Sequence, residues 1–74
     1  MHITYYQVRP RFCDGAWQDK IIRARTVHGR TLDECFEKVI KGMYCFDLMD
    51  RVKIKKPAID EIFQKFQEEY FAGK

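Results

Sequence analysis

The stretch "TVHGRTLDECFEKVIKGM", residues 26–43, decides the fold because it joins a strand to a helix. Residues 31–34 (TLDE) fit a capping box, in which the Thr31 hydroxyl accepts the backbone N–H of Glu34 and the Glu34 carboxylate reaches back. Apolar residues then recur at helical spacing and form one stripe: Leu32, Cys35, Phe36, Val39, Ile40 and Met43. The sequence therefore predicts a turn at residues 28–29 and a helix that begins after Thr31 and ends between residues 42 and 49.

Two strands are predicted before this stretch. Residues 3–12 (ITYYQVRPRF) are rich in β-branched and aromatic side chains, Asp14-Gly15 is a hairpin turn signal, and residues 19–27 (DKIIRARTV) form the return strand. Side chains alternate between the faces of a strand, so we expect an apolar face against the helices and a basic face toward solvent. The apolar set is Thr4, Tyr6, Val8, Phe12, Ile22, Ala24 and Thr26, and the basic set is Tyr5, Gln7, Arg9, Arg11, Arg23 and Arg25.

The length of the hairpin loop determines which residues share a face. A two-residue turn on Asp14-Gly15 would pair residue 12 with 17 and residue 8 with 21, which would place Arg23 on the face of Tyr6 and Val8. A three- or five-residue loop with Gly15 in the left-handed conformation would pair even residues with even ones. We therefore expect the longer loop, and a slip of one residue would exchange the two faces.

The C-terminal half predicts a second helix and an optional strand. Residues 51–56 (RVKIKK) alternate as a short third strand would, and they could equally form a linker. Pro57 suits the first turn of a helix that Gly73 would end, with the apolar stripe Ile59, Ile62, Phe63, Phe66 and Tyr70. We predict a single α+β domain over residues 1–74, a small antiparallel sheet with two helices packed on one face, in the order β-β-α-(β)-α.

Composition indicates a small cytoplasmic domain. A chain of 74 residues has a thin stability margin, which six Phe, four Tyr and one Trp help to supply. The three cysteines are an odd number without C-x-x-C spacing, and the first residues lack a signal-peptide pattern, so we expect reduced thiols. The apolar runs are far shorter than the ~18 residues of a membrane span, so no membrane partner is expected.

Positive charge concentrates on the predicted strands. Residues 1–30 and 51–56 carry ten of the fourteen Lys and Arg but two of the eleven acids. Such a face docks on acidic partners, although long Arg side chains also solvate a sheet without any partner. Trp17 could cap the sheet edge or serve as an exposed anchor. The predicted partner-binding residues are Tyr5, Arg9, Arg11, Trp17, Arg23, Arg25, Arg51, Lys53 and Lys55.

Catalytic and metal-binding patterns are not evident. Cys35 and His28 could be imagined as nucleophile and base, but Cys35 lies on the apolar helix stripe, where a thiol is inert, and His28 lies in a turn. A zinc site from Cys13, His28, Cys35 and Cys45 lacks ligand spacing. We therefore expect no enzyme activity, no metal and no cofactor.

The run "ARTVHGRTLDECFEKVIKGM", residues 24–43, resembles the strand–turn–helix joint of small ββα-type proteins of phages and mobile elements. Among these are HicB-like antitoxin domains and anti-CRISPR inhibitors. The resemblance covers about a quarter of the chain and implies a cytoplasmic inhibitor that occludes a surface on a larger protein or nucleoprotein complex. Many such inhibitors are acidic DNA mimics, whereas this chain has a net charge of +3. The alternative is a protein that binds DNA or RNA directly through the same basic face.

Overall fold

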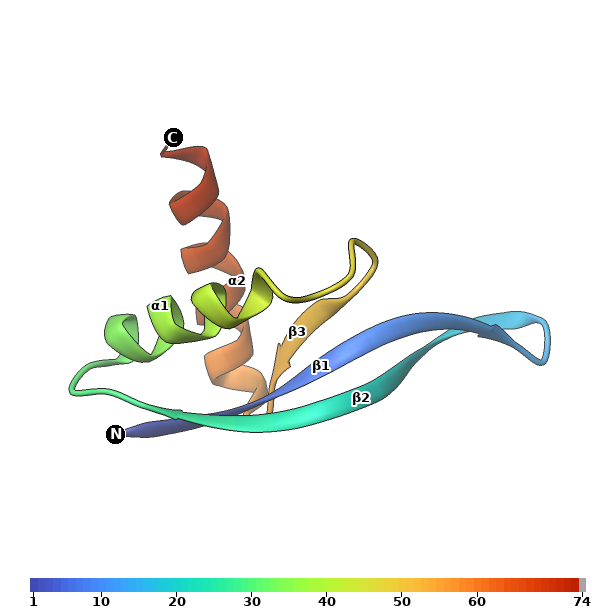
Figure 1. The fold of residues 1–74 in the computed structure, drawn as a ribbon, viewed down its shortest axis with the longest axis horizontal. Helices are drawn as coiled ribbons and strands as arrows, with labels where there is room; N and C mark the ends of the chain where they lie inside the picture. The colour runs from blue at the N-terminus through green and yellow to red at the C-terminus, as the bar shows by residue number, and fades with distance from the viewer. Residues whose placement is uncertain (74) are drawn as a thin grey trace.

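The computed structural model describes residues 1–73 as a three-stranded antiparallel sheet with two helices on one face (Figure 1). The elements are β1 (His2–Cys13), β2 (Ala16–His28), α1 (Leu32–Met43), β3 (Arg51–Ile54) and α2 (Pro57–Ala72). β1 is the central strand and pairs antiparallel with both β2 and β3. The predicted α+β order is confirmed, and residues 51–54 form a third strand instead of a linker.

Both helices begin at the residues that the sequence predicts. The Thr31 hydroxyl accepts the backbone N–H of Glu34 at 3.2 Å, and the Glu34 carboxylate accepts the backbone N–H of Arg30 at 3.1 Å. α1 ends at Met43, inside the predicted interval, while α2 starts at Pro57. Gly29 is needed before α1, because a Cβ there would lie 3.1 Å from both the backbone nitrogen and the Sγ of Cys35.

The core lies between the helices and the part of the sheet that is formed by the first residues of β1 and by β3. Phe36 of α1 and Phe63 of α2 meet at its centre, with ring centroids 5.2 Å apart. The predicted helix stripes are buried or partly buried except for Ile62, which is exposed, and Cys35 is a fully buried packing residue. The other buried members of the core are Ile3, Tyr5, Val39, Ile40, Val52 and Ile54.

The two faces of the sheet are exchanged relative to the prediction. Ile3 and Tyr5 are buried in the core, so the odd residues of β1 face the helices, whereas the even residue Val8 is buried outside the core cluster. Directly opposite residues of an antiparallel pair share a face. Arg25, opposite Tyr5, and Arg23, opposite Gln7, therefore also lie on the helix side. On the other side, which we call the open face, the hydroxyls of Thr4 and Thr26 are 2.9 Å apart.

The hairpin closes with a two-residue turn, so the expected longer loop is wrong. Asp14 and Gly15 both have positive φ, 51° and 79°, as a type I′ turn requires. A two-residue turn with regular pairing would place Arg23 on the face of Tyr6 and Val8, and an irregularity inside β2 prevents this. Register runs from Val8 opposite Ile21 to Gln7 opposite Arg23, so Ile22 is the extra residue of a β-bulge. The bulge moves Arg23 off the face of Tyr6 and Val8.

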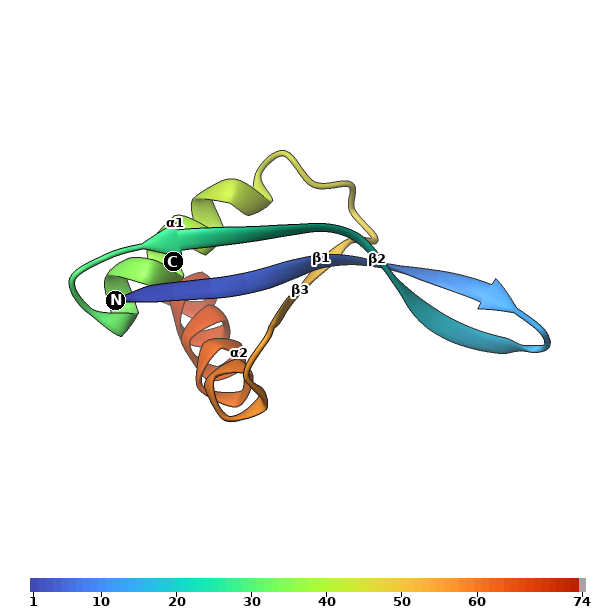
Figure 2. The same cartoon turned by 90° about the horizontal axis from the view of Figure 1, so that it is seen from below.

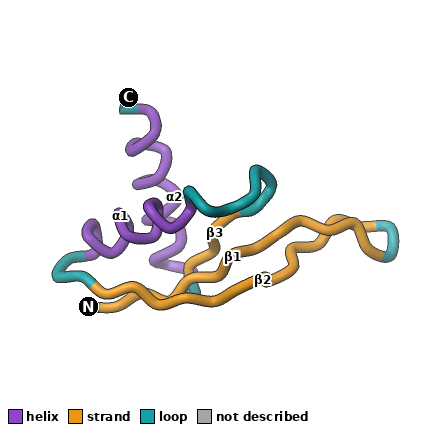
Figure 3. Tube along the Cα trace, viewed as in Figure 1, coloured by secondary structure: helices purple, strands orange, loops and turns teal. Residues whose placement is uncertain are grey.

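β1 and β2 continue past β3 as a twisted two-stranded ribbon, which we call the hairpin arm (residues 9–22; Figures 2 and 3). β3 pairs only with residues 5–8 of β1, and every residue from 11 to 26 is exposed. The radius of gyration is 12.8 Å, against about 11.3 Å for a compact domain of this length. The accessible surface is 5654 Å², against about 4,850 Å² for a compact monomer of this mass. The arm thus lies outside the core.

Candidate functional site

The open face of the hairpin arm carries large apolar side chains. The two-residue turn places Phe12 opposite Trp17, and their rings meet edge-on with centroids 5.5 Å apart. Phe12 is 62% exposed and Trp17 is 68% exposed, although each covers part of the other. Monomeric proteins normally cover such side chains, so this surface has the composition of an interface. We call it the apolar strip, and it comprises Pro10, Phe12, Trp17 and Ile21.

Cations of β3 border the apolar strip on the same face. Lys53 lies opposite Tyr6 and Arg51 opposite Val8, which places both on the open face. Arg51 donates to Asp19 of the arm at 2.7 Å, so its charge is matched locally. Lys53 and the following Lys55 are exposed, and within residues 1–73 neither side chain has a hydrogen-bond or ion-pair partner.

The remaining predicted cations lie on the opposite, helix-side face. Arg25 and Arg23 lie there through their pairing with Tyr5 and Gln7, and Arg11 follows along the arm, together with Lys20, which was not among the predicted residues. All four are exposed, and none of the four side chains has a hydrogen bond or ion pair in the described part of the chain. The predicted single basic surface is therefore two surfaces. We call this second one the basic stripe: Arg11, Lys20, Arg23 and Arg25.

Arg9 holds the base of the arm to the loop between α1 and β3. Its Nε donates to the buried carboxylate of Asp50 at 2.7 Å, and its Nη2 donates to Asp47 at 2.7 Å. Gln7 Nε2 also donates to Asp50, at 2.7 Å. The hydrogen bond from Arg9 lowers the pKa of Asp50 to about 2, against the burial that opposes ionisation, and the same bond raises the pKa of Arg9. Arg9 therefore has a structural role, because its ion pairs connect β1 to the loop before β3; we call this pair with Asp50 the latch.

Tyr5 was also predicted to bind a partner, and this prediction is wrong because its side chain is buried. It is 2% exposed, and a Cβ on Gly42 would lie 3.1 Å from its hydroxyl, so it packs tightly under α1. Phe12 and Ile21 instead belong to the exposed surface, and neither was among the predicted site residues. The Asp14-Gly15 signal could have revealed Phe12, because a two-residue turn places it opposite Trp17.

The cysteine and histidine side chains do not form a common site in the described part of the chain. Cys13, at the tip of the arm, and Cys45, after α1, are exposed, whereas Cys35 is buried. His28 ends β2, and its ring centroid is 5.9 Å from that of His2. Among residues 1–73 no three His, Cys, Asp or Glu side chains gather closely enough to hold a metal ion. None of the described helices is long and apolar enough to span a bilayer.

Comparison of the chain with protein-family models, curated proteins and solved structures gives no match. The function must therefore be argued from the surfaces of the arm and the sheet.

Proposed function

We propose that this is a non-enzymatic interaction protein that docks its hairpin arm and open face on a larger protein or nucleoprotein partner. The observation that supports the proposal is the apolar strip, which lies on an arm without a core behind it. Aromatic side chains such as Trp17 dominate the energetics of protein interfaces. An inhibitor of the phage type, as the resemblance implies, would occlude its target through such a surface.

The size of the exposed arm suits this role. The accessible surface exceeds that of a compact monomer by about 800 Å². One partner of a standard protein–protein interface buries about the same area. Lys53, which lies opposite Tyr6 on the same open face, would add a positive charge that favours an acidic partner surface. The arm is therefore large enough for a stable contact.

The test is capture of partners from host lysate by the tagged protein, with and without nuclease. A Phe12→Ser/Trp17→Ser variant should lose a nuclease-resistant partner while it still unfolds in a cooperative thermal transition. Phe71→Ser is the matched control, because Phe71 is an exposed aromatic on α2, away from the sheet. Equal capture by the arm variant and the parent would refute docking through the apolar strip.

Direct nucleic-acid binding is the second candidate, and the basic stripe favours it. Four exposed cations without acidic partners follow the helix-side face of β1 and β2, and two of them, Arg11 and Lys20, lie on the two-stranded ribbon of the arm. The major groove of DNA admits such a ribbon, and Arg makes bidentate contacts with guanine and phosphate. If Arg11, Arg23 and Arg25 each contact a phosphate, changing all three to Gln should lower the slope of log affinity against log salt by about 3. Lys65→Gln on α2 is the control.

Gel shifts with duplex and single-stranded DNA and RNA measure this slope. Absence of binding at ~50 mM salt would refute the second candidate. It would leave docking on a protein partner intact, because the apolar strip and the basic stripe lie on opposite faces.

A further inference from the structure

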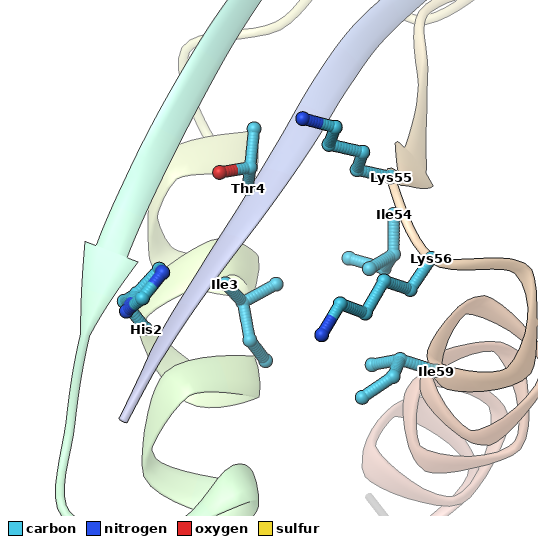
Figure 4. Close-up of a pocket in the computed structure, with 7 residues that line it drawn as sticks. All are labelled: His2, Ile3, Thr4, Ile54, Lys55, Lys56 and Ile59. Carbon is cyan, nitrogen blue, oxygen red and sulfur yellow. The ribbon is translucent and has the colours of Figure 1, made fainter.

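A small cleft opens where β3 ends and the chain leaves the sheet for α2 (Figure 4). Ile3 of β1, Ile54 of β3 and Ile59 of α2 supply its apolar wall, and Figure 4 shows the side chains of Ile54 and Ile59 pointing toward β1. The volume is about 200 Å³. Pockets for drug-sized ligands are larger, about 300–1,000 Å³. The cleft therefore suits one aliphatic side chain and not a large cofactor.

The mouth of the cleft is cationic. Lys55 and Lys56 extend from the end of β3 toward β1, as Figure 4 shows. Both are exposed, and within residues 1–73 neither ammonium group forms an ion pair or a hydrogen bond. No Asp or Glu lines the cleft. An aliphatic group that enters would be held best if it carried a negative charge beside it.

The cleft also exposes an unused pairing position on β1. The backbone N–H of Lys55 donates to the C=O of Thr4 at 3.0 Å, and the C=O of Met1 accepts from Gly29 on the β2 side. Backbone groups alternate along a strand, so the N–H and C=O of His2 point to the β3 side, as those of Thr4 do. The chain has turned into α2 by Pro57, before it could pair with His2. An extended segment can add there by strand pairing.

We propose that this cleft binds the C-terminus of another protein chain, one that ends in an aliphatic residue with a free carboxylate. The last side chain enters between the three isoleucines, the carboxylate contacts Lys55 and Lys56, and the peptide backbone pairs with His2. This site is separate from the docking proposed for the arm, and neither requires the other.

The experiment is an NMR titration of the ¹⁵N-labelled full chain with acetyl-alanyl-alanyl-valine. Saturable shifts should concentrate at the amides of residues 2–4, 54–56, 58 and 59. The same peptide with a C-terminal amide should bind about tenfold more weakly or worse, because it lacks the charge that the two lysines contact. The free aliphatic acid isovalerate should also bind more weakly, because it cannot pair with His2.

A Lys55→Gln/Lys56→Gln variant should bind the acid and amide peptides equally, with an otherwise unchanged spectrum. Lys53→Gln is the matched control, since Lys53 lies opposite Tyr6 on the open face and outside the cleft, and it should keep the preference for the acid. The proposal is overturned if millimolar peptide gives no saturable shifts at the cleft or if the parent binds acid and amide alike. It is also overturned if isovalerate binds as tightly as the peptide.

Discussion

The same substitution at two phenylalanines should have very different costs, because one lies in the core and the other on the arm. Phe36 is fully buried and contacts the rings of Phe63 and Phe66, so Phe36→Ala should lower the free energy of unfolding by about 3–5 kcal/mol. Phe12 is 62% exposed, so only about two fifths of that burial is lost and Phe12→Ala should cost about 1–2 kcal/mol. The total free energy of unfolding of a domain of this length is about 4–11 kcal/mol.

Urea unfolding followed by circular dichroism at 25 °C measures both changes. Phe36→Ala should remove about a quarter of the stability or more, whereas Phe12→Ala should leave a cooperative transition whose midpoint shifts about two fifths as far. Equal losses would refute the reasoning, because they would mean that the ring of Phe12 is covered in solution and that the arm does not project from the core.

Three further predictions test the Arg9–Asp50 ion pair, the close approach of Gly29 to α1 and the exposure of the three cysteines. Because the folded pKa of Asp50 is lowered to about 2 from its ordinary 3.8, the latch stabilises fully above about pH 4. That contribution is lost as the pH falls toward 2, and Asp50→Asn should remove this part of the dependence in melts from pH 7 to 2. Gly29→Ala should lower the melting temperature, since the new Cβ meets the backbone of Cys35 at 3.1 Å and α1 must shift; an unchanged melt would contradict that close approach. In a native thiol titration Cys13 and Cys45 should react fast and Cys35 only on unfolding, and three fast thiols would contradict the burial of Cys35.

The local signals in the chain predicted its elements well. The capping residues Thr31 and Glu34, the helical stripe that follows and Pro57 act through neighbours within one turn, so the first residues of both helices follow from the sequence alone. The alternation in residues 51–54 likewise indicated a strand. For the candidate site, exposure of Trp17, Lys53, Arg11, Arg23 and Arg25 agrees with the prediction, but their grouping on one face does not.

The sequence by itself determined the order of elements, the caps and the separation of basic strands from acidic helices, because each depends on neighbouring residues. Only the tertiary structure decided which face of β1 is buried. Both alternating sets contain apolar residues, and the helices cover Ile3 and Tyr5 but not Phe12. The single extra residue Ile22 then reconciles the tight turn with that choice. A one-residue change of register exchanges every side chain between faces, and long-range packing, not local propensity, selects between the two.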